Sequence, residues 1–97
     1  MNRRKRQDAN QTPIVRELIQ AGYSVHDLSA VGGGLTDILV GGIDRRTGER
    51  RNWLFEIKTE KGKLNPLQKE WHASWRGVVH VVRTPNEALT IVGALQQ

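Results

Sequence analysis

Residues 52–58 read "NWLFEIK", and this stretch decides the fold because it alternates two kinds of side chain. Side chains on a β-strand point alternately to opposite faces, so Phe55 and Ile57 share one face while Glu56 and Lys58 share the other. The apolar pair predicts a face that packs against a core. The opposite face then carries a carboxylate and an ammonium two residues apart, which points to a function beyond folding.

The composition is that of one small folded domain. The chain has 97 residues, of which 37% are hydrophobic and 26% are charged, as is usual for globular proteins. No apolar run reaches the length of a membrane-spanning helix, and no signal-peptide core is present. Cysteine is absent, which excludes disulfides and thiolate metal sites. We therefore expect a cytoplasmic protein with no membrane partner.

The formal net charge of +5 is concentrated at the N-terminus. Four of the fifteen basic residues lie within residues 3–6, whereas residues 8–97 carry eleven basic and ten acidic side chains. An almost neutral body argues against binding nucleic acid by bulk charge alone. We expect residues 1–9 to be a basic tail, either solvated or touching DNA, and residues 10–97 to form a single domain.

The three prolines mark the expected helix starts, because each follows a side chain that can cap a helix: Thr12-Pro13, Asn65-Pro66 and Thr84-Pro85. We therefore predict helices over about 13–21, 66–76 and 85–95, and strands over 23–28, 36–40, 52–57 and 78–82. Residues 41–51 are expected to be a hairpin connection. This order predicts an α/β fold with helices against a mixed sheet, its last strand parallel to the third.

The acidic residues of the expected second and third strands predict a metal site. Asp37 is the only charged residue between Asp27 and Asp44, and pairing of its strand with the third would bring it towards Glu56. Two carboxylates repel unless a cation lies between them, and Mg²⁺ binds one or two carboxylates together with water and phosphate oxygens. The backbone carbonyl of Ile57 is a further candidate ligand, and Lys58 can stabilise charge that develops on phosphorus.

Glycines and basic residues surround these positions. Gly33 and Gly34 would let a DNA backbone approach closely, although a plain turn is the alternative. Lys61 and Lys63 follow the third strand, and Arg45 and Arg46 lie at the hairpin. These four side chains either hold phosphates or serve solubility.

Taken together, "GGGLTD", "FEIK" and a following helix that bears Gln68 resemble the PD-(D/E)xK nuclease superfamily. The chain is most similar to the stand-alone form of the virus-type replication-repair nuclease (VRR-NUC) group. The resemblance covers residues 13–92 and implies a restriction-endonuclease-like α-β-β-β-α-β core. Thr36 stands where the superfamily has proline.

This resemblance implies roles for individual residues. Asp37 and Glu56 become metal ligands, and Lys58 becomes the residue that positions the attacking water. Gln68 matches a glutamine near the catalytic centre of the family, with an ordinary boundary residue as the alternative. Glu17 on the first helix either completes the metal site or is an exposed helical charge.

The resemblance also implies a function. We expect an endonuclease that depends on Mg²⁺ or Mn²⁺, acts as a homodimer and cleaves branched DNA such as four-way (Holliday) junctions in a prokaryotic or phage-infected cell. No small-molecule cofactor beyond the metal is expected. The alternative is a non-catalytic DNA-binding module or accessory subunit on the same fold.

Overall fold

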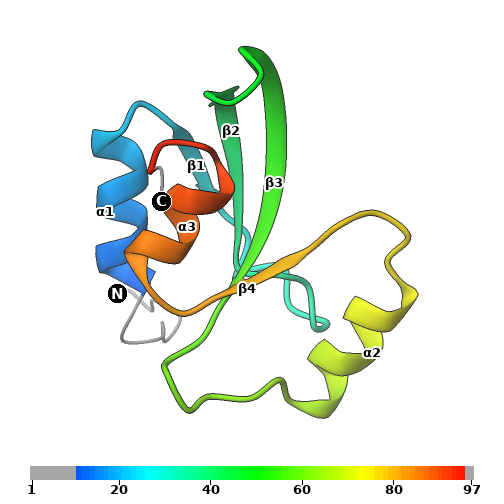
Figure 1. Ribbon diagram of the computed structural model, residues 1–97. Coiled ribbons are helices and arrows are strands. Elements are labelled where there is room, and N and C mark those ends of the chain that lie inside the picture. Colours follow the sequence, from blue (N-terminus) through cyan, green and yellow to red (C-terminus); the bar gives the residue numbers. More distant parts are fainter. Residues whose placement is uncertain (1–10, 96–97) are drawn as a thin grey trace.

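Four strands form one mixed sheet, with three helices around it (Figure 1). The computed structural model describes residues 11–95, with only the backbone of the first two; the predicted basic tail, residues 1–9, lies outside this range. The elements are α1 (Gln11–Gln20), β1 (Ser24–Asp27), β2 (Ile38–Asp44), β3 (Glu49–Ile57), α2 (Pro66–Ser74), β4 (His80–Val82) and α3 (Pro85–Ile91).

The strands lie in the order β1-β2-β3-β4. β1 pairs with β2 and β2 pairs with β3 in antiparallel fashion, whereas β4 runs parallel to β3. The α/β class, the mixed sheet and the parallel last strand are therefore confirmed. None of the helices in the described part of the chain is long and apolar enough to cross a membrane.

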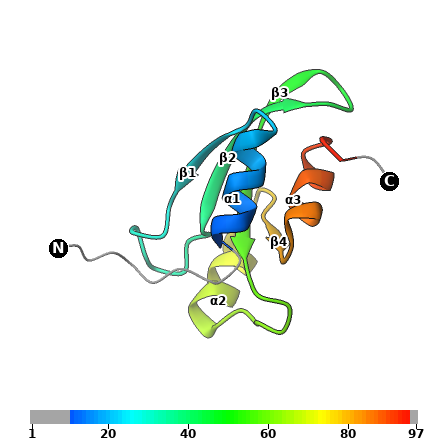
Figure 2. The same ribbon diagram turned by 90° about the vertical axis from the view of Figure 1, so that its left-hand side faces the viewer.

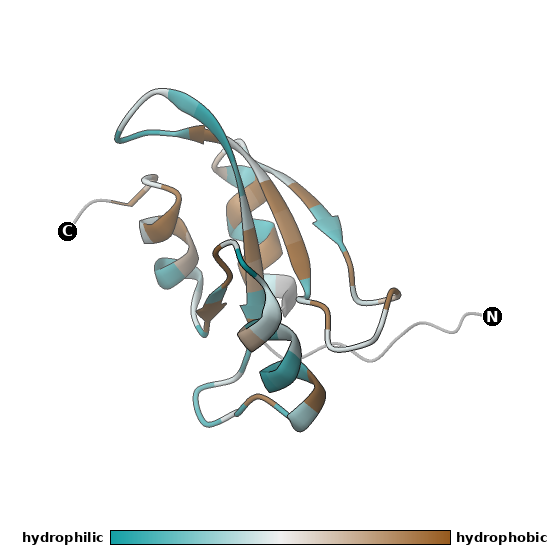
Figure 3. Cartoon of the chain, turned by 90° about the vertical axis from the view of Figure 1, so that its right-hand side faces the viewer, coloured by the Kyte–Doolittle hydropathy of each residue, from teal (hydrophilic) through white to brown (hydrophobic). Residues whose placement is uncertain are grey.

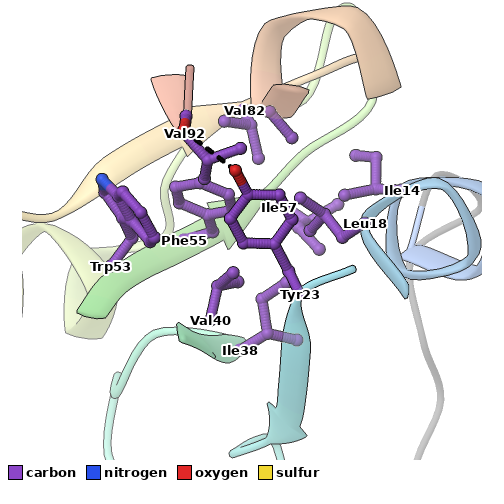
Figure 4. Close-up of a cluster of buried hydrophobic side chains, with 11 residues drawn as sticks. Ile14, Leu18, Tyr23, Ile38, Val40, Trp53, Phe55, Ile57, Val82 and Val92 are labelled. Carbon is purple, nitrogen blue, oxygen red and sulfur yellow. Dashed lines mark hydrogen bonds between the residues drawn. The ribbon is translucent and has the colours of Figure 1, made fainter. Parts of the chain in front are cut away.

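One face of the sheet forms the core, as the alternation in β3 predicts. Phe55 and Ile57 are completely buried and pack with Ile38 and Val40 of β2. α1 and α3 cover this face side by side, whereas α2 lies apart from them at one end of the sheet (Figures 1 and 2). Ile14 and Leu18 supply the apolar stripe of α1, which Figure 4 shows facing the strands.

The hairpin between β2 and β3 is longer than predicted. Residues 41–51 were expected to be a hairpin connection around Thr47-Gly48; the turn does contain these two residues, but the ladder continues to the pair Asp44↔Glu49 and leaves only residues 45–48 in the turn. The tip of this hairpin and the adjoining half of β3 are hydrophilic (Figure 3). The glycine-rich composition wrongly predicted a connection over residues 41–44. These residues instead pair with β3, in a part of the sheet where the strands are partly exposed.

The helix boundaries differ from the expected ones at several ends. Asn65 and Thr84 cap α2 and α3 as predicted, but α1 already includes Gln11, so Thr12 is not its cap. α2 ends at Ser74 rather than at residue 76. α3 ends at Ile91 rather than at residue 95, because Gly93 takes a positive φ of 84° that reverses the chain. The first and last strands are also shorter than expected, and β2 begins one residue after Asp37.

Tyr23 and two arginine side chains at the hairpin turn hold the hairpin against the helices. The Tyr23 hydroxyl lies 2.7 Å from the Ile43 carbonyl and 3.1 Å from the Val92 carbonyl, the second contact being drawn in Figure 4. The guanidinium of Arg45 donates to the Ala21 carbonyl, and that of Arg46 donates to the Ile91 carbonyl. Residues at the turn are thus tied to the ends of α1 and α3.

Asp44, which directly precedes these two arginines, is buried. Its Oδ1 accepts hydrogen bonds from the Arg46 backbone N–H at 3.0 Å and from Arg46 Nε at 3.2 Å, and Oδ2 lies 3.3 Å from Arg51 Nε. The hydrogen bond from the Arg46 backbone N–H lowers the pKa of Asp44 below its ordinary value; burial acts in the opposite direction, and the Arg46 and Arg51 guanidinium groups lower the pKa further. A Cβ at Gly93 would lie 2.9 Å from Asp44 Oδ1, so only glycine fits there.

We predict that Asp44→Asn lowers the free energy of unfolding at neutral pH. A carboxyl group with a lowered pKa in the folded state stabilises the fold above its ordinary pKa and loses this effect as the pH falls through the folded value. The difference between wild type and variant, measured by urea unfolding, should therefore shrink below about pH 4. Glu49→Gln, which removes an exposed carboxylate from the same hairpin, should change little. A constant difference from pH 7 to pH 3 would contradict this role.

Candidate metal and nucleic-acid site

Asp37 and Glu56 lie at the same end of the sheet, where β2 begins and β3 ends. Asp37 was expected inside a strand, but it immediately precedes β2 and its side chain completes the pairing with β3. Its Oδ2 accepts the Ile57 backbone N–H at 2.7 Å, and its own N–H donates to the Phe55 carbonyl at 3.1 Å. The Asp37 carboxylate is therefore held against the backbone of β3, next to Glu56.

The backbone of Ile57 points in a direction that suits a ligand. In a β-strand the N–H and C=O groups of one residue point to the same side. Because the Ile57 N–H donates to the Asp37 carboxylate, its carbonyl is also directed to the Asp37 side of β3. On the other side of β3, the Lys58 N–H donates to the Val82 carbonyl of β4 at 3.0 Å.

Glu56 is a completely buried carboxylate on the face of β3 opposite the core. Its Oε2 accepts a hydrogen bond from Gln68 Nε2 at 3.1 Å and lies 3.9 Å from the Lys58 ammonium. Its Oε1 lies 3.4 Å from His72 Nε2. Burial of a carboxylate is costly unless it is hydrogen-bonded and near positive charge, and these three side chains meet that need.

Gln68 both caps α2 and hydrogen-bonds Glu56. Its Oε1 accepts the Asn65 backbone N–H at 2.9 Å, while Asn65 Oδ1 accepts the Gln68 backbone N–H at 2.9 Å. This reciprocal pair is a capping box that begins α2. Because the amide group of Gln68 also donates to Glu56, the start of the helix is fixed relative to the buried carboxylate.

His72 of α2 also contacts Glu56. It lies one helical turn after Gln68, so the i, i+4 spacing was the available signal. Burial lowers the pKa of His72, the nearby Lys58 charge lowers it further, and Asp37 acts in the opposite direction. The lowered pKa favours a neutral imidazole that donates a hydrogen bond to Glu56 rather than forming an ion pair.

A hollow of about 270 Å³ lies beside Asp37. The glycine-rich loop and the start of α2 form its walls, with Gly34 and Leu67 in close contact: a Cβ at Gly34 would lie 2.5 Å from the Leu67 carbonyl oxygen. Gly33 is exposed, and a Cβ there would meet nothing within 4 Å. Of the two predicted glycines, Gly34 is therefore needed for packing and Gly33 faces open space.

Lys61 and Lys63 lie in the loop that connects β3 to α2, and both are exposed. The Arg83 guanidinium contacts three backbone carbonyls of this loop, a role that the sequence did not indicate. Its Nη1 lies 2.6 Å from the Thr59 carbonyl oxygen, 2.8 Å from that of Gly62 and 3.4 Å from that of Glu60. Because β4 is parallel to β3, Arg83 follows β4 at the same end of the sheet as Lys58.

The structure does not bring the other predicted residues to this place. Arg45 and Arg46 lie at the hairpin tip, roughly 25 Å along the strands from Glu56. Their guanidinium groups contact the carbonyls of Ala21 and Ile91, so both have structural partners. Glu17 is exposed on α1, a helix that packs with α3 and β1.

The donor set fits Mg²⁺ or Mn²⁺ better than Zn²⁺, which is usually held by histidine and cysteine. Within residues 11–95, no group of three or more His, Cys, Asp or Glu side chains is arranged to hold a metal ion. Mg²⁺ requires fewer protein ligands, because it keeps water and takes substrate phosphate oxygens. Asp37, Glu56 and the Ile57 carbonyl supply only oxygen ligands, which is the chemistry that this ion prefers.

Thr36, which directly precedes Asp37, is completely buried. Its Oγ1 has no hydrogen-bond partner among the described residues. A buried hydroxyl without a partner costs stability, so the unpaired group is a local weakness directly before Asp37.

Comparison of the chain with protein-family models, with curated proteins and with solved structures gave no match.

We predict that Asp37→Asn and Glu56→Gln each weaken binding of Mn²⁺ by about tenfold or more, because each removes an anionic oxygen ligand. Isothermal titration calorimetry measures the affinity. Glu70→Gln, which neutralises an exposed carboxylate on α2, is the control and should bind Mn²⁺ as wild type does. Glu17→Gln should also bind Mn²⁺ as wild type does, because the structure does not bring Glu17 to this site. Unchanged affinity in both Asp37→Asn and Glu56→Gln would refute the metal site.

Proposed function

We propose that this protein is a Mg²⁺-dependent endonuclease that hydrolyses phosphodiester bonds in branched DNA such as four-way junctions. The observation that carries the proposal is the arrangement at the end of β3. A buried Glu56 lies beside Lys58, and Asp37 is held against the intervening Ile57 backbone. The proposal includes a restriction-endonuclease-like core, with which the sheet and its flanking helices are compatible.

The resemblance in the sequence and the contacts support the same roles. Asp37, Glu56 and the Ile57 carbonyl would hold Mg²⁺, which when bound supplies positive charge that polarises a phosphodiester oxygen. Lys58 is only 14% exposed, so its ammonium is sheltered and held near Glu56. In this position it can orient a water molecule and stabilise the negative charge that develops on the phosphoryl group.

Gln68 and His72 act on Glu56 rather than on DNA in this proposal. Their hydrogen bonds restrict the rotation of the carboxylate, so that its remaining lone pairs keep a defined direction. Gly33 lies in the loop before Asp37, and Lys61 and Lys63 lie in the loop after Lys58; in this proposal they contact the phosphate backbone, while Gly34 allows its loop to pack on α2. Arg45 and Arg46 remain candidates for more distant phosphates, since a guanidinium has five donors.

A twofold homodimer is part of the proposal, because two identical sites suit paired nicks on opposite strands of a junction. Of the three tryptophans, Trp53 belongs to the core and offers no surface to a partner. Other apolar side chains, Ile43 and Val78 among them, are exposed and offer surface to a second copy.

One observation favours the alternative of a non-catalytic DNA-binding module. Both oxygens of Glu56 already contact protein side chains, so the carboxylate is stabilised without a metal. The two functions differ in one measurable property, because only the nuclease cleaves DNA when Mg²⁺ is added.

We predict Mg²⁺-dependent nicking of four-way junctions in preference to linear duplex of the same sequence. Rates should be measured on linear, nicked, flapped and four-way substrates, with Mg²⁺ and with EDTA. Glu56→Gln, purified in the same way, controls for contaminating nucleases and should be inactive. Binding of junctions without cleavage in Mg²⁺ or Mn²⁺ would support the non-catalytic module, and equal rates on junction and linear DNA would contradict structure selectivity.

We also predict that Lys58→Ala folds and binds Mn²⁺ but cleaves about 100-fold or more slowly, because it loses a positioned positive charge. Single-turnover rates with saturating enzyme isolate the chemical step from DNA binding. The control is Arg16→Ala, which removes a positive charge from the exposed surface of α1. A wild-type rate in Lys58→Ala would rule out the assigned role.

A further inference from the structure

The outer part of α2 carries an apolar stripe that the rest of the structure leaves uncovered. Leu67, Trp71 and Trp75 recur every four residues, the spacing of a core-facing stripe. α2 nevertheless has no buried residue; Leu67 is 59% exposed and Trp75 is 45% exposed. In Figures 1 and 2, α2 stands at one end of the sheet, away from the helix pair that covers the core.

The indole rings of Trp71 and Trp75 are stacked on each other, with their centroids 5.0 Å apart and their planes 14° from parallel. Trp71 also meets the His72 ring edge-on at 5.8 Å. Gly77 allows the chain to turn back across the ring edge, since a Cβ there would lie 2.9 Å from Trp75 Nε1. The exposed ring of Trp75 is thus supported from one side rather than free to rotate.

The position of this stack relates it to the candidate site. Trp71 precedes His72, which contacts Glu56, and both tryptophans lie within two helical turns of Gln68. A group bound on Trp75 is therefore close to any phosphate that is held at Asp37 and Glu56.

The positive charge of residues 58–76 indicates which kind of partner could bind the tryptophan stack. Residues 58–76 carry five basic and two acidic side chains, and Arg76, which directly follows Trp75, is exposed. A second copy of this chain would bring the same positive surface against itself, which is unfavourable. A polyanion is attracted, and of the groups in a nucleic acid only a base has the flat apolar face that stacks on an indole.

We propose that the Trp71–Trp75 stack is a platform for an unpaired nucleobase, which the protein uses to select DNA with a branch or flap next to the bond that it cleaves. This inference rests on the proposed nuclease function and names the substrate feature that the site recognises. A base inside a duplex is stacked on both sides, whereas the first unpaired base at a branch has a free face for Trp75.

The test measures binding in EDTA, so that no cleavage is required. The ligands are a flapped duplex whose first unpaired base is 2-aminopurine and a fully paired duplex with 2-aminopurine at the same position. Trp75→Ala should bind the flap about fivefold or more weakly and lose the change in 2-aminopurine fluorescence, with less than a twofold effect on the duplex. Trp75→Phe should retain most of the affinity, because it retains an aromatic face.

Ile19→Ala is the matched control, since it removes an exposed apolar side chain from α1, and it should bind both ligands as wild type does. Equal losses on flap and duplex, or no loss on either, would overturn the platform. Sedimentation showing that Trp75→Ala separates a dimer would also overturn it, by assigning the stack to a second copy. Flap-selective binding without any cleavage would refute the nuclease and leave the platform in place.

Discussion

A carboxylate with no exposure to water is the constraint on which this end of the molecule depends. Glu56 is on the face of β3 that the core does not use, so water would normally solvate it. Gln68 and His72 of α2 replace that water, and Lys58 brings an opposite charge to 3.9 Å. Removal of any one partner leaves a buried charge less well compensated, and this couples the strand to the helix.

The same constraint explains why α2 can exist as a separate helix. Helices of nine residues are marginal alone, and α2 buries no residue of its own. It is stabilised instead by its capping box, by polar contacts to Glu56 and by the close approach of Gly34 to the Leu67 carbonyl. Polar contacts of this kind are directional, so they set the orientation of the helix, whereas the apolar packing of α1 and α3 sets most of the stability.

Features that depend on neighbouring residues in the chain could be predicted from the sequence. Features that depend on contacts between residues distant in the chain could not. Alternation around Glu56 predicted the two faces of β3, and the Asn65-Pro66 pair predicted the start of α2. Residues 41–51 were misread, because Gly41 and Gly42 resemble turn residues while pairing of β2 with β3 keeps them in strands. Arg83 was missed because its partners are three carbonyls more than twenty residues away, and no spacing rule reports them.

The Arg83 contacts also determine how the loop before α2 presents its backbone. The planar trans peptide points its N–H opposite to its C=O, so three carbonyls that converge on one guanidinium turn the following N–H groups outward. These belong to Glu60, Lys61 and Lys63. The outer surface of the loop therefore shows the positive ends of three peptide dipoles beside two ammonium groups, and it keeps part of its attraction for anions even when both lysines are neutralised.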